Sequence, residues 1–560
     1  MRQGDDRHQP PIDSQSLPSL CESGRLYGDR LQQWCGEAMA NNQSWKQLRQ
    51  RWLWGLIVLL IATGVVLRFV NLDRKVYWAD EAYTSLRISG YTEREFIRTA
   101  FTGDRLTVAE LQRYQHPTSA KTWGDAFRAF RGNAEHSPLY FLLARVWVQF
   151  WGSSIATIRA LSACISLLAF PALYWLCREL FASRPVTAVA LAFLAISPLH
   201  ILYAQEARQY SLWTVTTLFS GAALLWTLRT QTRRSWSVYA LSIALGLYSH
   251  LLFALVAVAQ AVYVAVQEKW RLSKVTLAYL LSTLAGVTLF LPWLIVALLN
   301  LERIQKTTAS LNLRNSLSHV FDRWFLNLNL VFVNQDLGSA NLILVAIAAV
   351  ALWFLCSTAP RRTWLFVLLL VAVTSLPLAF PDLVMGGQRS LRVRYLIPCY
   401  LGVQIAIAYL LTTLSIRWRG WQQSIGRVLL VALLVASLMG CLLSVNAEVW
   451  WNKSRVRTSY FPGVARIINQ ANRPLVVSDA VPIDILSFSH ELKPNVQLQL
   501  ARIPGKIRIA ENVKRLYLFN SSNRLRNRLV KVYGFRATRA YTDESGTRLW
   551  RLDRPAVRPE

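Results

Sequence analysis

Residues 275–299 read VTLAYLLSTLAGVTLFLPWLIVALL, a long run without one charged side chain. A helix needs about 20 predominantly apolar residues to cross the hydrocarbon core of a bilayer. Comparable runs recur along the chain, and 53% of all residues are hydrophobic. We therefore predict an all-α polytopic membrane protein with about eleven transmembrane helices, at 53–71, 155–177, 185–203, 209–228, 236–250, 251–267, 275–299, 339–357, 363–381, 394–414 and 428–446.

The charge balance is strongly basic, with 62 Lys and Arg against 31 Asp and Glu. Nucleic-acid binding is one explanation, but no binding motif accompanies the charge. Cytoplasmic loops of membrane proteins are enriched in Lys and Arg, which explains the excess better. We expect membrane lipids and phosphate-bearing substrates as partners, and no nucleic acid. The seven cysteines form no CxxC pair and no disulfide framework.

Basic residues between the predicted spans give the orientation, because they mark the cytoplasmic side. They are Lys46, Arg49, Arg51, Arg229, Arg233, Arg234, Lys269, Arg271, Lys274, Arg361, Arg362, Arg417, Arg419 and Arg427. The N-terminus then lies inside a cytoplasmic (inner) membrane and the C-terminus outside. Asp80 and His136 then lie outside and Arg178 inside, so only one crossing fits between His136 and Arg178, although both 138–152 and 155–177 are apolar. We predict an interfacial or re-entrant helix at 138–152; the alternative is that it spans and a neighbouring segment does not.

The chain divides into three predicted parts. Residues 1–50 are polar, lack an early apolar segment, and indicate a partly disordered cytoplasmic tail rather than a cleaved signal peptide. Residues 51–446 form the transmembrane domain, with a long external loop at 72–137. Residues 447–560 alternate apolar and polar positions at 474–478 and 515–519, which predicts strands, while 464–468 predicts a helix. A small external α/β domain follows from this pattern.

Four polar motifs stand at the predicted external ends of apolar runs. They are WADEAY at 78–83, EHSPLY at 135–140, QEARQY at 205–210 and YSH at 248–250. Ionisable side chains are costly near hydrocarbon, so their presence there suggests a site. Each motif has a simpler explanation: a solvated acidic pair, a histidine at a helix start, or an arginine that reaches lipid headgroups. Their convergence on one side favours function.

The chemistry of these residues suits proton and phosphate handling. One carboxylate of the pair Asp80 and Glu81 can accept a proton from an attacking hydroxyl, while the other orients the site or holds a metal. The planar donor fork of Arg208 suits a phosphate. Arg389, Arg392 and Arg394 lie at an outer membrane end, against the usual charge distribution, and an anionic substrate headgroup would explain them.

Together these motifs resemble the GT-C superfamily of membrane glycosyltransferases. The similarity is to the branch of protein mannosyltransferases and lipid A aminoarabinose transferases (glycosyltransferase family 39). The shared pattern is Asp80-Glu81, His-x-Pro-Leu-Tyr at 136–140, Arg159, Ser197-Pro198, Tyr-x-Gln-Glu-Ala-Arg-x-Tyr at 203–210, Tyr-x-His at 248–250 and Arg-Tyr-Leu-x-Pro at 394–398. It covers about 50–446. Ser137 departs from it, since many relatives carry a second proline there.

The resemblance implies an inverting transfer of a sugar from a polyprenyl-phosphate donor to a hydroxyl of a lipid, glycan or protein, outside the membrane. It implies that Asp80 is the base, that Glu81 orients it, and that Arg208 and Arg394 stabilise the departing phosphate. The donor-binding set that it implies is His136, Tyr140, Tyr203, Gln205, Glu206, Arg208, Tyr210, His250, Arg392, Arg394 and Tyr395. A divalent metal is compatible with the superfamily, but its ligands cannot be assigned.

Three other functions share some of these features. A polymerase or ligase of lipid-linked glycans would use similar carboxylates and arginines on a longer acceptor. A transporter of polyprenyl-linked sugars should show internal repeats and polar groups at the bilayer midplane, and the sequence shows neither. A structural subunit would have no reason to gather Asp, Glu, His and Arg on one side. The glycosyltransferase is therefore the preferred hypothesis.

Overall fold

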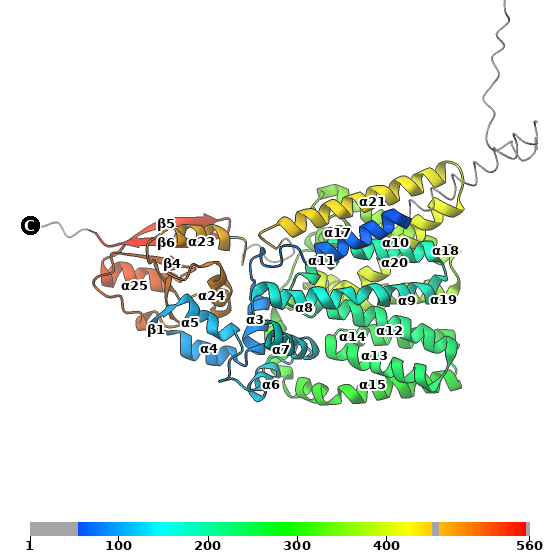
Figure 1. Cartoon of the computed structure of the whole chain (residues 1–560), viewed down its shortest axis with the longest axis horizontal. Helices are drawn as coiled ribbons and strands as arrows, with labels where there is room; N and C mark the ends of the chain where they lie inside the picture. Colours follow the sequence, from blue (N-terminus) through cyan, green and yellow to red (C-terminus); the bar gives the residue numbers. More distant parts are fainter. Residues whose placement is uncertain (1–53, 451–457, 556–560) are drawn as a thin grey trace, which may run out of the picture. The chain divides into compact units, whose positions relative to one another are not determined.

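The computed structural model describes residues 54–450 and 458–555, which form a bundle of helices and one six-stranded sheet (Figure 1). The predicted tail at 1–50 lies outside the described residues. The helices of the bundle are α8 (Ile155–Leu167), α9 (Ala169–Phe181), α10 (Arg184–Ala195), α11 (Pro198–Ala204), α12 (Tyr210–Thr230), α13 (Arg233–Ser249), α14 (Phe253–Gln267), α15 (Lys274–Leu299), α16 (Leu301–Thr308), α17 (Leu317–Phe332), α18 (Asn341–Thr358), α19 (Arg361–Met385), α20 (Ile397–Arg417) and α21 (Trp421–Asn446).

Seven helical segments of the described chain are long and apolar enough to cross a membrane. They are Ile155–Phe181, Tyr210–Thr230, Lys274–Leu299, Gly338–Thr358, Arg361–Met385, Val393–Ile416 and Trp421–Asn446. The pair α10 and α11, bent by 56°, makes an eighth if it counts as one span. The chain is thus a multi-pass membrane protein, as predicted. The predicted number of eleven is not confirmed, because the helix Trp54–Leu67, α13 and α14 have no more than 17 residues each.

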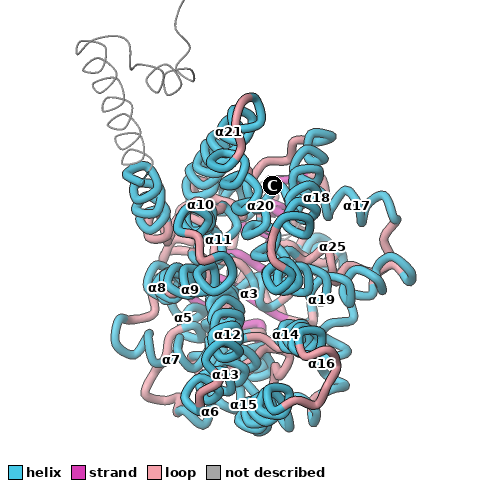
Figure 2. The backbone as a smooth tube through the Cα atoms, turned by 90° about the vertical axis from the view of Figure 1, so that its right-hand side faces the viewer, coloured by secondary structure: helices cyan, strands magenta, loops and turns pink. Residues whose placement is uncertain are grey.

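The helices pack in a connected series. α9, α12, α13 and α15 lie side by side in that order, and α20 packs against α10, α18, α19 and α21 (Figure 2). The segments of α12 and α20 are the most deeply buried of the seven. Because both helices run through the interior, side chains at their first turns reach the centre of one end of the bundle.

The bend between α10 and α11 has a local cause. Pro198 opens α11 and supplies no backbone N–H, so the carbonyls at the end of α10 lack helical partners. The buried Arg68 replaces them: its Nη1 donates to Ala195 O at 2.8 Å and its Nη2 to Leu194 O at 3.0 Å. The short helix α11 follows the bend, and the chain then continues into 205–209 at the end of the bundle that contacts α3.

The loop at 72–137 is largely structured. It contains α3 (Ala79–Ile88), α4 (Glu93–Ala100), β1 (Thr102–Thr107), α5 (Val108–Gln112) and α6 (Trp123–Arg131), and α7 (Leu139–Trp151) follows it. Helix α7 has 13 residues, fewer than the about 20 that a membrane crossing requires. Its length agrees with the prediction that 138–152 does not span.

The sheet has the order β1-β3-β2-β4-β6-β5. Its strands in the C-terminal region are β2 (Leu475–Ser478), β3 (Gln497–Ala501), β4 (Arg515–Phe519), β5 (Arg536–Asp543) and β6 (Gly546–Asp553), with helices α23 (Phe461–Asn469), α24 (Pro482–Phe488) and α25 (Asn523–Tyr533). β2 pairs in parallel with β3 and β4, whereas β1, β5 and β6 are antiparallel to their neighbours. The predicted strands and helix are all present.

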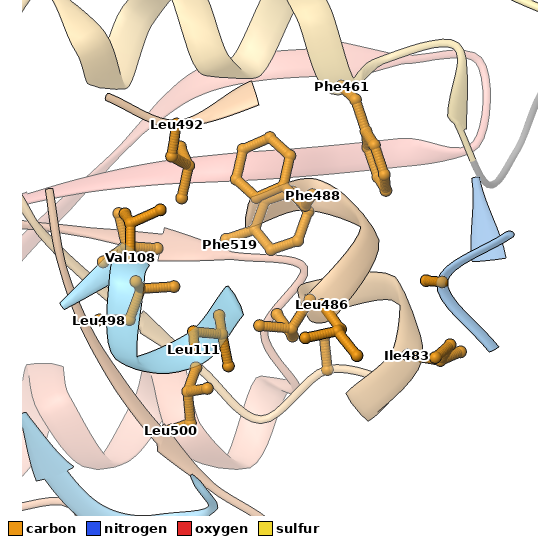
Figure 3. Close-up of a cluster of buried hydrophobic side chains, with 14 of the residues drawn as sticks. Val108, Leu111, Phe461, Ile483, Leu486, Phe488, Leu492, Leu498, Leu500 and Phe519 are labelled. Atoms are coloured by element: carbon orange, nitrogen blue, oxygen red, sulfur yellow. The ribbon is translucent and has the colours of Figure 1, made fainter. Parts of the chain in front are cut away.

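One strand of this sheet does not come from the C-terminal region. β1 belongs to the loop at 72–137 and pairs with β3, with Leu106 opposite Leu498. The two regions also share a core, in which Val108 and Leu111 of α5 pack with Phe488 and Phe519, whose rings stack at 4.1 Å (Figure 3). The segment 447–560 is therefore not self-contained; the boundary at 446 stays a prediction.

Candidate active site

Helix α3 carries the acidic pair and presents two faces. Trp78 is the N-cap residue, and its backbone N donates to Glu81 Oε2 at 3.4 Å. Asp80, Thr84 and Arg87 follow at spacings of four and three residues, so they share one face, while Glu81 points to the adjacent side. α3 packs against α7, α6 and α24. Asp80 and Glu81 therefore lie in two different environments.

Glu81 is fully buried and held from several directions. Arg159 of α8 grips both of its oxygens, with Nε to Oε1 at 2.8 Å and Nη2 to Oε2 at 2.7 Å. The backbone N of Ala207 donates to Oε1 at 3.0 Å. Arg159 also donates to the carbonyls of Leu72, Lys75 and Val76. Glu81 therefore joins α3, α8 and 205–209, and its orienting role stays a prediction.

Asp80 meets a second arginine at the open side of α3. Its Oδ2 accepts from Arg394 Nη1 at 2.9 Å, and about a quarter of each side chain is exposed. Arg394 lies in the 3₁₀ turn η4 (Val393–Leu396), directly before α20. The structure thus brings together two residues that are more than 300 positions apart in the sequence. A carboxylate beside a guanidinium, both reachable from solvent, can act on a substrate.

Arg208 lies along the same face of α3. Its Nη1 donates to Asp80 O and to Thr84 Oγ1, both at 3.3 Å. Its Nη2 lies 3.2 Å from His136 Nε2. Burial, and then the charge of Arg208, lower the pKa of His136 well below its usual value of 6.5. His136 is therefore neutral at physiological pH, and its Nε2 accepts from the guanidinium.

Aromatic rings line the neighbouring side of the site. The guanidinium of Arg394 lies over the rings of Tyr210 and Tyr395, at 5.9 and 5.6 Å from their centroids. His250 stacks on Trp213 at 4.0 Å and meets Tyr395 edge-on at 6.2 Å. These rings fix the position of Arg394 through cation–π contacts.

Four residues of the predicted substrate- and phosphate-binding set contact the framework, and their binding role stays a prediction. The Tyr140 hydroxyl bonds Ser162 Oγ at 2.8 Å, and Glu206 accepts from Trp78 Nε1 at 3.1 Å. Gln205 binds Lys75 and the carbonyls of Leu67 and Val70. The Tyr203 ring packs on the Tyr210 ring, with 4.9 Å between the centroids. All four are buried. Arg392 lies in the same loop as Arg394 and donates to Gln388 Oε1 at 3.1 Å.

Three further residues of this region were not predicted from the sequence. Lys75 is buried and donates from Nζ to Gln205 Oε1 at 2.8 Å; burial, and then Arg159, lower its pKa to about 7. Arg87 is buried on the Asp80 face of α3. Asp382 is buried in α19 and accepts from Ser390 N and Oγ, both at 2.7 Å. Only the spacing of Arg87, two helical turns after Asp80, gave a usable signal.

Asp382 also shapes the loop that carries Arg394. It accepts from Arg389 Nη1 at 3.3 Å, so it ties 389–390 to the end of α19. Gly387 has a φ of +148°, and a Cβ there would lie 2.4 Å from Asp382 Oδ1. Glycine at this position lets the backbone approach the carboxylate closely enough for these bonds.

Ligands for the predicted divalent metal cannot be assigned among the described residues. They contain no group of three or more His, Cys, Asp or Glu side chains placed to hold one. Both oxygens of Glu81 are already engaged by Arg159. The site is therefore described through its own side chains alone.

Comparison with known proteins places this geometry in a family context. Residues 135–296 match the family described as dolichyl-phosphate-mannose-protein mannosyltransferase. The fold matches the crystal structure of ArnT from Cupriavidus metallidurans bound to undecaprenyl phosphate, with a TM-score of 0.53, 15% identity, and 90% of this chain and 98% of that chain covered. The fold is that of the GT-C glycosyltransferases. It resembles the branch that contains protein mannosyltransferases and ArnT, as the motifs predicted.

Other comparisons report further likenesses to this GT-C fold. The apo structure of the same ArnT gives a TM-score of 0.50 at 13% identity, over 89% of this chain and 97% of that one. An apo oligosaccharyltransferase from Archaeoglobus fulgidus gives 0.47 at 11% identity, over 90% and 75%. No curated protein matches the chain by sequence.

Proposed function

We propose that this protein is an inverting glycosyltransferase that moves a sugar from a polyprenyl-phosphate donor to an acceptor hydroxyl, on the external face of the cytoplasmic membrane. The observation that carries the proposal is the juxtaposition of the partly exposed Asp80 with Arg394 and Arg208. A base and two phosphate-binding groups at the end of a membrane bundle suit a reaction between a lipid-anchored phosphate and a hydroxyl.

The reaction needs one proton acceptor and one stabilised leaving group. The acceptor oxygen attacks the anomeric carbon from the side opposite the phosphate, and its proton passes to the Asp80 carboxylate. The bond between the anomeric carbon and the phosphate oxygen breaks, and its electron pair leaves with the polyprenyl phosphate. Arg394 and Arg208 stabilise the charge that develops there. Attack from the opposite side inverts the anomeric configuration.

Neighbouring residues hold these groups in place. Neutral His136 accepts from Nη2 of Arg208, and Nη1 of Arg208 is directed at Asp80 O and Thr84 Oγ1. Glu81 and Arg159 fix the start of α3, so the position of Asp80 is set before substrate binds. Tyr210, Tyr395 and His250 form the aromatic side of the site.

The test is sugar transfer by the purified full-length protein in detergent. It receives a panel of polyprenyl-phosphate sugars, with membrane extract as the source of acceptors. We expect transfer by the wild type, loss of transfer in Asp80→Asn and Arg208→Ala, and full transfer by Arg128→Gln, which alters an exposed arginine of α6. Equal transfer by Asp80→Asn and the wild type overturns the assignment of the base. Lipid flipping across liposomes without transfer supports a transporter instead.

A further inference from the structure

Arg87 is a buried guanidinium that the proposed reaction does not use. It lies on α3 with 4% of its surface exposed, and its Nε and Nη1 have no hydrogen-bond partner among the described residues. Its guanidinium lies over the Tyr83 ring, 4.9 Å from the centroid, which supplies attraction but no acceptor. Buried polar groups in folded proteins almost always have a partner, so this arginine points to a ligand.

Three further side chains near Arg87 have unsatisfied buried atoms. They are Glu135 through Oε2, Arg208 through Nε, and Gln209 through Oε1. His136 connects them, because it follows Glu135 directly, bonds Arg208 through Nε2, and lies 3.5 Å from Gln209 Nε2 through Nδ1. We call Arg87, Glu135, Arg208 and Gln209 the polar cluster. Arg87 lies in α3, Glu135 lies in the loop before α7, and Arg208 and Gln209 come directly before α12. Helix α3 packs against α7 and α6 (Figure 1).

The charges of the cluster act on one another. Arg87 experiences the positive charge of Arg208 and the negative charges of Glu135 and Asp80. Burial, and then Arg208, lower the pKa of Arg87 to about 10, so it stays charged at neutral pH. An ionised group in the interior requires pairing or hydrogen bonding, which the described side chains only partly supply.

Arg208 belongs to both the cluster and the proposed reaction centre, whereas Arg87 is displaced from Asp80 along α3. Asp80 and Arg87 are seven residues apart on one face, which corresponds to about 10 Å along the helix axis. Arg208 spans the interval, because it bonds Asp80 O and Thr84 Oγ1. A molecule whose reacting carbon lies at Asp80 can therefore extend to Arg87.

The mixture of donors and acceptors identifies the kind of ligand. Arg87 and Arg208 offer N–H donors, Glu135 offers oxygen acceptors, and the amide of Gln209 offers both. A phosphate brings only acceptors and would be repelled by Glu135. A sugar hydroxyl both donates and accepts, so a ring with several hydroxyls can satisfy all four side chains.

We propose that Arg87, Glu135 and Gln209 bind the hydroxyls of the sugar that is transferred, on the side of the donor away from its lipid. This inference rests on the proposed function, and it names the residues that determine which sugar the protein binds. Asp80, Arg394 and Arg208 then handle the reacting end, while Arg87, Glu135 and Gln209 distinguish one sugar ring from another.

The test compares two lipids that differ only in the sugar. Binding of polyprenyl phosphate and of a polyprenyl-phosphoryl hexose is measured for the wild type, Arg87→Gln, Glu135→Gln and the control Arg128→Gln. We expect both cluster variants to bind the sugar-bearing lipid about tenfold more weakly, the loss of one charge-assisted hydrogen bond. Their affinity for the sugar-free lipid should match that of the wild type. Arg394→Gln should weaken both lipids.

The other outcomes separate the two proposals. Equal weakening of both lipids by Arg87→Gln and Glu135→Gln assigns the cluster to phosphate binding and overturns this inference while leaving the proposed function intact. Unchanged binding of both lipids also overturns it. A wild type that binds neither lipid overturns the proposed function itself. Glu135→Gln, on a loop and half-buried, keeps the test decisive if Arg87→Gln does not fold.

Discussion

The two faces of α3 treat neighbouring carboxylates in opposite ways. Glu81 is fully buried and bound through both oxygens to a buried arginine. Asp80, its neighbour in sequence, is about a quarter exposed and accepts from Arg394 Nη1 at 2.9 Å. We call these the closed face and the open face. The same chemistry supports the fold on the closed face and is available to a substrate on the open face.

Burial, rather than residue type, therefore determines whether each carboxylate supports the fold or is available to a substrate. A buried ion pair is costly to break, because the remaining charge has no solvent. A partly exposed pair contributes little to stability and can exchange partners with a ligand. Substitutions on the open face should therefore change activity, whereas those on the closed face should change stability.

The largest effect is expected on the open face. Asp80→Asn removes the proposed base, and we expect the transfer rate to fall by about 10²- to 10⁴-fold. The thermal unfolding midpoint in detergent should change little, since an exposed pair is worth about 1 kcal/mol or less. A large loss of stability in this variant would erase the contrast between the faces.

On the closed face, Glu81→Gln should act on stability. Removing one partner of a buried pair costs about 3–5 kcal/mol, because Arg159 remains charged and buried. Thermal unfolding of the purified protein measures this loss. The matched control is Glu302→Gln, whose pair with Lys306 is exposed and 4.0 Å long, and which should be neutral. An equal shift in both variants would show that Glu81 is not held as described.

The loop that carries Arg394 should give an intermediate effect. Asp382→Asn weakens the bonds to Ser390 and Arg389, so Arg394 loses its fixed approach to Asp80. We expect transfer to fall by about tenfold, in line with the loss of charge-assisted hydrogen bonds. Kinetics over a range of donor concentrations check this. Asp543→Asn, in the sheet, is the control; an equal loss there would contradict a role for the loop.

A more gradual effect concerns pH and the buried lysine that precedes α3. The folded pKa of Lys75, about 7, lies below its ordinary value of 10.5. Between these values the unfolded chain binds more protons, so this contribution to stability rises with pH, by at most about 1.4 kcal/mol per unit. It is lost as pH falls toward 7. Relative to Lys75→Met, the wild type should gain unfolding free energy between pH 7 and 9, whereas exposed Lys493→Met should give no such trend.

Much of the fold was predictable because the bilayer imposes a length on apolar helices. The run at 275–299 and the strands at 474–478 and 515–519 each carry a local periodicity or composition that names the element. Strand β1 has no such signal: its sequence, TGDRLT, lacks alternation. Its partner β3 is distant in sequence, so tertiary pairing determines it.

The site was predictable in membership and less so in role. Asp80, Arg208, His136 and Arg394 come together as the motifs suggested. Gln205 and Glu206 resemble ligand-binding residues in sequence, yet they bind the framework. Only burial and partners, which depend on distant segments, separate these classes.

The pairing of β1 with β3 has a consequence for biogenesis. β1 leaves the ribosome long before its partner β3. The packing of α3 likewise requires α24, and the segment before α3 is bound by Trp450, whose Nε1 donates to Val76 O at 2.7 Å. Contacts of such long sequence separation form late in folding. The helix that bears Asp80 is therefore completed only when translation is nearly finished, so an unfinished chain in the membrane holds its reactive groups unassembled.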